Sequence, residues 1–168
     1  MCTYYHATNK DFRVGERFSI NMFDGTMSSY HAGLTEKKKK VNEIFDRWRP
    51  NNVLSRIKCI YLFDNLCHCK HYAKSEKYKH IYKVLSEEKV FGPFPLVLLN
   101  TFYKNHKRQI IREYWNPTKE WKFVEYLASS FIVVKEESLG IISNMDIEVD
   151  RDLANRLFST QHDNRSFI

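Results

Sequence analysis

The chain has 168 residues, of which 43% are hydrophobic and 15% aromatic, so it can bury a real core as one domain and leaves little room for a second. Lys and Arg outnumber Asp and Glu by 27 to 20, and the formal charge of +7 favours an anionic partner without identifying one. No apolar run approaches the roughly 20 residues that cross a bilayer, and no signal peptide is visible, so we expect a cytosolic chain that does not enter a membrane.

The first expected element is a strand over residues 3–8. Alternation along this strand places Tyr4, His6 and Thr8 on one face, with the neighbouring tyrosine and alanine on the other. Histidine is often partly buried in proteins, so His6 is either a packed strand residue or a residue that hydrogen-bonds a ligand in a cleft. A turn at Gly15 and a short extended piece are expected to follow.

Residues 21–33 contain turn signals and are expected to form a loop. A helix is predicted next, from the N-cap Thr35 to about Arg49, because apolar residues recur at helical spacing and Pro50 ends the pattern. Four lysines at 37–40 lie in its first turns, against the helix dipole, and form either a solvated face or a patch that contacts phosphates. The apolar stripe of this helix consists of Val41, Ile44, Phe45 and Trp48.

The rest of the chain alternates between strand-like and helix-like patterns. The predicted elements are strands at 56–64, 79–86, 94–105 and 130–137, and helices at 119–129 and from about Asp150. The strand at 94–105 has helical spacing toward its end, and the helix at 119–129 rests on the spacing of Trp121, Val124 and Leu127. These patterns predict one α+β domain over 1–158 with a loose tail at 159–168.

A cluster of Cys and His residues follows Asp64 and has two interpretations. It contains Cys67, His68, Cys69 and His71, all of which are zinc-ligand types. Structural zinc sites usually combine ligand pairs from distant segments, and adjacent residues of a helix point in different directions, so the spacing disfavours a metal. The alternative is a short amphipathic helix. Its inward residues are expected to be Leu66, Cys69, Tyr72 and Ala73, and its solvent-facing residues Cys67, His68, Lys70 and His71.

Three separated segments occur in an order that periodicity alone does not suggest. They are Tyr5-His6-Ala7-Thr8, then Ile60-Tyr61-Leu62-Phe63-Asp64, then Tyr114-Trp115 through Trp121 to Glu125-Tyr126-Leu127. Arg49-Pro50 and Ser55-Arg56 lie between the first two. In this order the segments resemble the histidine, tyrosine and glutamate segments of ADP-ribosyltransferases, most closely a family of small bacterial and phage transferase-like proteins. The likeness covers roughly residues 4–136.

The resemblance implies a split antiparallel β-sheet core with flanking helices, and transfer of ADP-ribose from NAD to a macromolecular acceptor, a nucleic acid or an acidic protein, as in toxins, effectors and phage–host conflict proteins. By the same resemblance, His6 hydrogen-bonds the adenosine-side ribose of NAD and Tyr61 stacks on nicotinamide. Glu125 holds the nicotinamide-ribose 2′-hydroxyl and stabilises the oxocarbenium-like transition state. Further NAD contacts are implied for Thr8, Arg56, Tyr114 and Trp115, with the guanidinium at the pyrophosphate.

The sequence leaves the acceptor and two other functional classes open. Phe123 stands two positions before Glu125, so the acidic or amide residue of the arginine-directed toxins is absent. One alternative is a nucleic-acid-binding module with exposed aromatic side chains as stacking platforms. Another is a catalytically inactive transferase fold that serves as an interaction protein, and a hydrolase with a metal in the Cys67–His71 cluster is more distant. The positive surface of the binding module consists of Lys37 to Lys40, Lys104, Lys107, Arg108 and Arg112.

Overall fold

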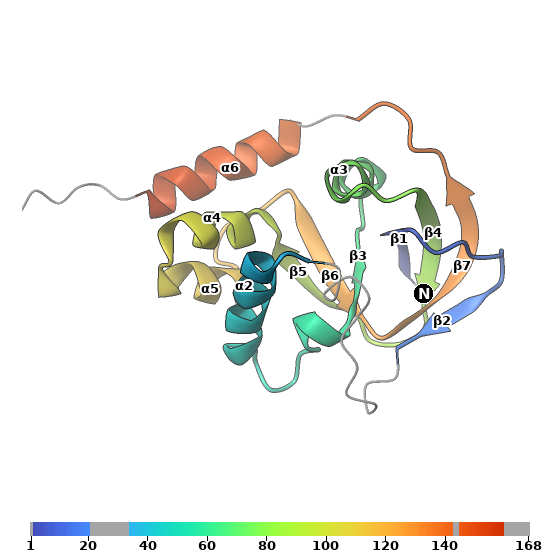
Figure 1. Cartoon of the computed structure of the whole chain (residues 1–168), viewed down its shortest axis with the longest axis horizontal. Coiled ribbons are helices and arrows are strands. Elements are labelled where there is room, and N and C mark those ends of the chain that lie inside the picture. Colours follow the sequence, from blue (N-terminus) through green and yellow to red (C-terminus); the bar gives the residue numbers. More distant parts are fainter. Residues whose placement is uncertain (1, 21–33, 143–144, 160–168) are drawn as a thin grey trace, which may run out of the picture.

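The fold combines two antiparallel sheets with α-helices (Figure 1). A computed structural model of the chain describes residues 2–20, 34–142 and 145–159. Five α-helices and seven strands lie in these ranges. The α+β class predicted from the sequence is therefore confirmed.

The larger sheet has four strands in the order β1-β4-β7-β2, with antiparallel pairing throughout. Its strands are β1 (Cys2–Thr8), β2 (Arg17–Ser19), β4 (His80–Ser86) and β7 (Ser130–Glu137). The smaller sheet has the order β3-β6-β5. Its strands are β3 (Ile60–Leu62), β5 (Phe91–Pro95) and β6 (Val124–Ala128). An isolated antiparallel bridge connects the two sheets, between Tyr5 of β1 and Phe63, the residue that follows β3.

Most helices lie beside the smaller sheet, on the side away from the larger one (Figure 1). This group consists of α2 (Glu36–Arg47), α4 (Val97–Asn105), α5 (Arg108–Trp115) and α6 (Met145–Phe158). The helix α3 (Leu66–Glu76) packs instead against β1 and β4. A single 3₁₀ turn, Arg56–Lys58, precedes β3. The smaller sheet is therefore covered by helices on one face and by the larger sheet on the other.

This arrangement buries β3 on both of its faces. Tyr61 belongs to the core formed with the helices, whereas Ile60 and Leu62 belong to the core between the sheets. Such two-sided burial explains why β3 is a continuous apolar run and lacks alternation between apolar and polar residues. Alternation in β1 is observed as predicted, because Ala7 packs under α3 and Tyr4 packs in the core between the sheets.

Side chains cap the first turns of α2 and α3, and another side chain anchors α6. The Thr35 hydroxyl accepts a hydrogen bond from the backbone N–H of Lys38 (3.4 Å) at the start of α2, as predicted. The Asn65 side chain accepts from the backbone N–H of Cys67 (2.8 Å) at the start of α3. The Asp150 carboxylate of α6 accepts from the backbone N–H of Phe123 (2.7 Å), which fixes α6 against the residues that lead into β6.

Several predicted elements are confirmed and three are wrong. The strands predicted at 3–8, 79–86 and 130–137 and the helix that follows Asp64 are all present. Gly15 has the positive φ (83°) expected of the predicted turn before β2. The C-terminal helix is present but begins earlier than predicted, at Met145.

The first two errors concern the bounds of predicted strands. The predicted strand at 56–64 is a 3₁₀ turn followed by the three residues of β3. The segment predicted at 94–105 as a strand with helical spacing toward its end is the end of β5 followed by the whole of α4, so the helical continuation is confirmed and the length of the strand is wrong. In both cases a continuous apolar run lies in the core, and such runs do not distinguish a strand from a buried helix.

The third error concerns the segment 119–129, which was predicted as a helix but contains the strand β6. Trp121, Val124 and Leu127 are buried as expected, but Val124 and Leu127 lie in a strand that pairs with β3 on one side and with β5 on the other. A spacing of three residues is compatible with either structure when both faces of a strand are covered. The sheet therefore overrides the local pattern.

One predicted orientation is also wrong, and two predicted segments cannot be compared. The prediction that His68 faces solvent is wrong, because its Nε2 pairs with Asp146 of α6 (2.9 Å) and its buried ring packs edge-on against Phe123. The predicted loop at 21–33 lies outside the described residues, as does the predicted tail after Ser159.

Candidate functional site

The strands that carry the three family-like segments are neighbours in the fold. β1 carries His6, β3 carries Tyr61 and β6 carries Glu125. Tyr61 is paired with Leu127 across β3 and β6, so the side chains of Tyr61 and Glu125 lie on the same face of the smaller sheet. That face is covered by the helices.

Glu125 is held in a buried cluster by Arg56 and Tyr114. Its Oε1 accepts hydrogen bonds from Arg56 Nη1 and from the Tyr114 hydroxyl (2.7 Å to the hydroxyl). Arg56 Nε donates to the Asn42 side chain (2.9 Å), and the Tyr61 hydroxyl donates to the Arg56 carbonyl oxygen. Arg56 and Glu125 are each only 1% exposed. We call these five residues the Arg56 cluster.

The charges within the Arg56 cluster stabilise each other. Burial acts to lower the pKa of Arg56, but the charge interactions with Glu125 and with the surrounding Tyr114, Tyr61 and Cys59 together outweigh it, and the pKa of Arg56 lies well above its ordinary value. Burial and the charge of Glu125 raise the pKa of Tyr114 well above its ordinary value, so its hydroxyl stays protonated and donates to the carboxylate. The guanidinium also lies against the rings of Tyr61 (4.9 Å) and Tyr114 (5.2 Å). The cluster is a compact, water-excluded ion pair.

His6 does not join this cluster. Its Nδ1 lies 2.9 Å from the backbone carbonyl oxygen of Tyr61, and its ring packs against Phe131 (5.0 Å between ring centres) in the core between the sheets. Burial lowers the pKa of His6 to about 4, so the ring is neutral at physiological pH. The structure therefore brings Tyr61 and Glu125 together with Arg56, and it places the imidazole of His6 on the other side of β3.

The remaining residues implied by the resemblance have local partners. The Thr8 hydroxyl accepts from the backbone N–H of Lys10 (3.0 Å) at the end of β1. Trp115 Nε1 donates to the carbonyl oxygen of Phe45 (2.7 Å), which ties α5 to α2. Each of these contacts gives its residue a structural role that does not require a ligand.

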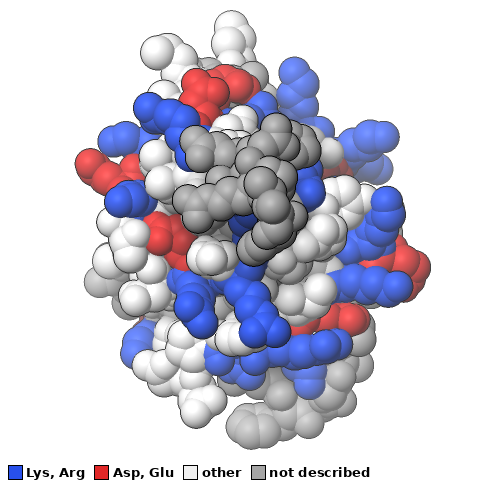
Figure 2. All heavy atoms as spheres, turned by 90° about the vertical axis from the view of Figure 1, so that its left-hand side faces the viewer, with Lys and Arg blue, Asp and Glu red and all other residues white. Residues whose placement is uncertain are grey.

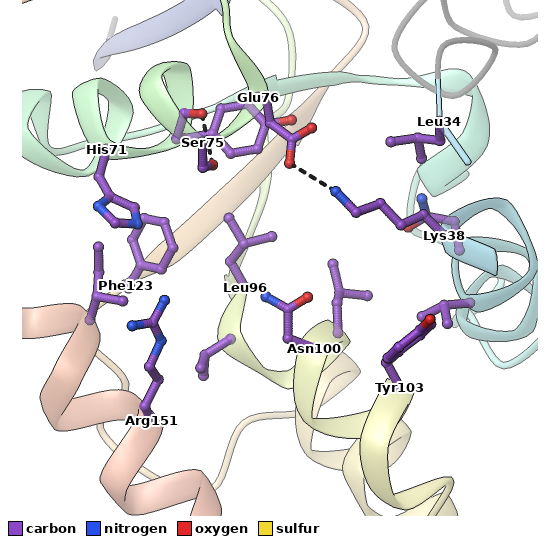
Figure 3. A pocket seen from close by; sticks show the side chains of 16 residues that line it. Leu34, Lys38, His71, Ser75, Glu76, Leu96, Asn100, Tyr103, Phe123 and Arg151 are labelled. Carbon is purple, nitrogen blue, oxygen red and sulfur yellow. Dashed lines mark hydrogen bonds and ion pairs between the residues drawn. The ribbon is translucent and has the colours of Figure 1, made fainter. Parts of the chain in front are cut away.

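A cavity of about 150 Å³ lies between α2, α3, α4 and α6 (Figure 3). Figure 3 shows Lys38 on one side of it and Arg151 on the other, with the side chain of Asn100 between them. Asn42 of the Arg56 cluster also lines the cavity, so the buried ion pair lies directly behind its wall. The other lining residues are Leu34, Val41, His71, Tyr72, Ser75, Glu76, Leu96, Val97, Leu99, Tyr103, Phe123 and Ile147.

A second candidate surface runs along α2 and onto α4 and α5, where two aromatic side chains are exposed. Lys37 lies over the ring of Tyr103 (5.3 Å), and Arg108 lies over the ring of Trp48 (5.4 Å). Tyr103 is 38% exposed and Trp48 is 45% exposed. The prediction that Trp48 belongs to the buried stripe of α2 is wrong, because Trp48 is the C-cap and lies at the surface.

Positive charge accompanies these aromatic residues. Figure 2 looks at the end of the molecule where α4, α5 and α6 lie, and it shows Lys and Arg side chains over much of this view, with a band of them across its lower part. Among the described residues, no ion pair engages Lys104, Lys107, Arg108 or Arg112. We call the surface formed by Lys37, Trp48, Tyr103, Lys104, Lys107, Arg108 and Arg112 the basic aromatic face.

The sequence indicates only part of these two surfaces. The basic residues of the face stand out as a group in the sequence, but Tyr103 falls within a predicted strand, and no sequence pattern points to Asn100 or Arg151. The cavity is formed by residues from four helices that are distant in sequence, and no spacing pattern along the chain reports such a convergence.

Three further findings bear on function. Within residues 2–20, 34–142 and 145–159, no group of three or more His, Cys, Asp or Glu side chains is arranged to hold a metal ion. The helices of these same ranges are all too short or too polar to span a membrane. No family model matches the chain, and no curated protein matches it in sequence. The contacts described above therefore carry the functional argument.

Proposed function

We propose that this chain binds single-stranded nucleic acid through the basic aromatic face. The observation that carries the proposal is the pair of exposed rings, Trp48 and Tyr103, each with a cation beside it. Bases stack on exposed aromatic rings whatever their identity, and the phosphates that connect them are neutralised by Lys and Arg. A surface with both features in alternation matches the repeating chemistry of a single strand.

The spacing of the two rings fits a strand that crosses several nucleotides. Lys37 and Trp48 lie at the two ends of α2, eleven residues apart, which corresponds to about 16 Å along the helix. At the Trp48 end, Arg108 lies over the indole ring and Arg112 lines the same surface hollow as Trp48. We therefore place the strand beside α2, with one base on Tyr103 and another on Trp48.

The experiment is a titration of fluorescently labelled oligo(U) and oligo(dT) with the protein, followed by anisotropy. The proposal predicts binding that weakens as salt rises, and that weakens about tenfold or more in the Trp48→Ala, Tyr103→Ala double variant. Lys79→Ala serves as the control, because Lys79 is exposed ahead of β4, on the far side of the smaller sheet. No binding by the wild type, or equal binding by the double variant, contradicts the proposal.

NAD-dependent ADP-ribosyl transfer is a second candidate, favoured by one observation. The three family-like segments lie on strands that adjoin one another, through the Tyr5–Phe63 bridge and the pairing of β3 with β6. In that reaction the bond between ribose and nicotinamide breaks, its electron pair leaves with nicotinamide, and an acceptor nucleophile bonds to the anomeric carbon and loses a proton. Glu125 takes part only if it leaves Arg56.

Nicotinamide release from NAD tests the second candidate. Release by the wild type that disappears in Glu125→Gln, with the variant folded by circular dichroism, shows that Glu125 acts in NAD cleavage, and label from NAD that appears on an acceptor distinguishes transfer from hydrolysis. A wild type that neither releases nicotinamide nor gains thermal stability with NAD leaves Glu125 as a structural residue. Nucleic-acid binding and NAD cleavage are measured separately, so either result stands without the other.

A further inference from the structure

We infer that the cavity between α2, α3, α4 and α6 takes one base of the bound strand, and that a single-ring pyrimidine is the better fit. This inference rests on the proposed nucleic-acid binding and identifies a specific subsite for it. Four features support it: the size of the cavity, its walls, the polar groups at its mouth and its position beside the basic aromatic face.

The size of the cavity selects a small planar group. Ligand pockets for drug-sized molecules usually measure about 300 to 1,000 Å³. The cavity here measures about 150 Å³, which is the size of an engineered cavity that holds a benzene molecule. One six-membered ring fits this volume, whereas a complete dinucleotide does not.

The walls of the cavity suit a ring. Aliphatic side chains and the aromatic rings of Tyr72, Phe123 and Tyr103 form the apolar part of the lining, and the remaining lining residues are polar or charged. Flat apolar surfaces of this kind stack on or pack around a base. The aliphatic residues are Leu34, Val41, Leu96, Val97, Leu99 and Ile147.

Polar groups at the cavity can read a base edge and hold a phosphate. The Asn100 side chain projects into the cavity (Figure 3), and its amide offers both donors and an acceptor to the Watson–Crick edge of a base. Lys38 pairs only loosely with Glu76 (3.5 Å), and Arg151 pairs with Glu148 on its own exposed helix face. The cation of each pair is half-exposed and pairs of this kind are weak, so both cations are available to the phosphate that accompanies the base.

Tyr103 connects the cavity to the basic aromatic face. Its ring lines the cavity, and the ammonium group of Lys37 lies over the same ring. A strand that follows α2 therefore passes the mouth of the cavity, where one base can turn inward while its neighbours stack outside. The same geometry makes Asn100 and Arg151 part of the strand site, although neither belongs to the basic group that stands out in the sequence.

The test uses Asn100→Phe, because Asn100 is exposed and a phenyl ring at this position fills the cavity without altering the core. Uridine 5′-monophosphate is titrated into the protein and followed by chemical shifts, with adenosine 5′-monophosphate and inorganic phosphate as separate probes. Labelled oligo(U) is titrated in parallel. Arg151→Ala removes a cavity cation, and Arg156→Ala on the same helix, outside the cavity, is its matched control.

The inference predicts that uridine monophosphate binds more tightly than adenosine monophosphate or phosphate, and that Asn100→Phe abolishes this binding and weakens oligo(U) about tenfold. Arg151→Ala weakens both ligands, and Arg156→Ala leaves both unchanged. Oligo(U) binding that is equal in the wild type and in Asn100→Phe overturns the inference while the proposed function stands. Binding of uridine monophosphate without any binding of oligo(U) overturns both, and identifies a site for free nucleotides.

Discussion

Arg56 and Arg108 each lie over an aromatic ring, yet their surroundings give them opposite roles. Arg56 lies 4.9 Å from the ring of Tyr61 and is 1% exposed, with Glu125 against its guanidinium. Arg108 lies 5.4 Å from the ring of Trp48 at the surface, and it has no acidic partner among the described residues. A cation that lies on an aromatic ring stabilises the core when a buried carboxylate neutralises its charge. The same pair at the surface, without a carboxylate partner, leaves the cation available to a ligand.

The residues that resemble a transferase site are not the residues that are exposed at the surface. The residues that resemble a transferase site, Tyr61 and Glu125 above all, have their polar atoms engaged by protein groups inside the core. Residues that carry no family signature, such as Tyr103, are exposed to solvent. Substitutions in the two regions should therefore affect different quantities: stability in the Arg56 cluster, and binding on the basic aromatic face.

The largest effect is expected for Arg56→Met. Removal of the guanidinium leaves the Glu125 carboxylate buried without its cation, so we expect the free energy of unfolding to fall by about 3–5 kcal/mol. Urea denaturation followed by circular dichroism measures it. The double variant Arg56→Met, Glu125→Leu should recover most of this stability, because no buried charge remains. An Arg56→Met protein as stable as the wild type would show that the ion pair is not structural.

The next effect is a dependence of stability on pH that comes from His6. Its folded-state pKa of about 4 lies below the ordinary value of 6.5, so the unfolded chain binds a proton more readily between these values. The contribution of His6 is therefore complete above pH 6.5 and is lost as the pH falls toward 4, and it amounts to at most about 3 kcal/mol. Unfolding free energies of the wild type and His6→Gln across this range should differ in slope, and parallel curves would contradict the burial of a neutral ring.

A smaller effect is expected for each aromatic residue of the face. Trp48→Ala and Tyr103→Ala should each weaken the binding of oligo(U) by about 1–3 kcal/mol, which is the range for removal of one stacked base. The same variants should unfold within about 0.5 kcal/mol of the wild type, because both side chains are substantially exposed. A drop in stability equal to the drop in binding would indicate misfolding and remove the support for stacking.

The smallest effect is expected for single cations of the face. Lys104→Ala or Arg112→Ala should lower the slope of log affinity against log salt by about 0.7 for each phosphate that the variant no longer neutralises. Anisotropy titrations at several salt concentrations measure the slope. Lys79→Ala should leave the slope unchanged, and a slope that is the same in all three variants would show that the strand lies elsewhere.

The sequence predicted the framework of the fold better than its site. Alternation identified β1 and β4, the segment at 130–137 identified β7, and Thr35 identified the start of α2, because these features are local. The error at β6 arose because both faces of that strand are covered, which removes the alternation that distinguishes a strand from a helix. The local sequence pattern identifies a strand when one of its faces is exposed to solvent. It does not distinguish a strand from a helix when both faces are buried.

The candidate site was less accessible to sequence reasoning, for a different physical reason. The functional value of Glu125 depends on whether its carboxylate meets solvent or Arg56, and this contact joins residues 69 positions apart. The availability of Trp48 depends on its position one residue beyond the end of α2, where it leaves the buried stripe. Such properties follow from tertiary packing, so the residue types could be named in advance but their roles could not.

The most direct test of the account is the affinity of labelled oligo(U) for the wild type, the Trp48→Ala, Tyr103→Ala double variant and Glu125→Gln, measured by anisotropy at one salt concentration. The account predicts that the affinity of the double variant falls at least tenfold, and that folded Glu125→Gln binds like the wild type, because the carboxylate lies inside the core. Equal affinity of the double variant and the wild type would contradict the account.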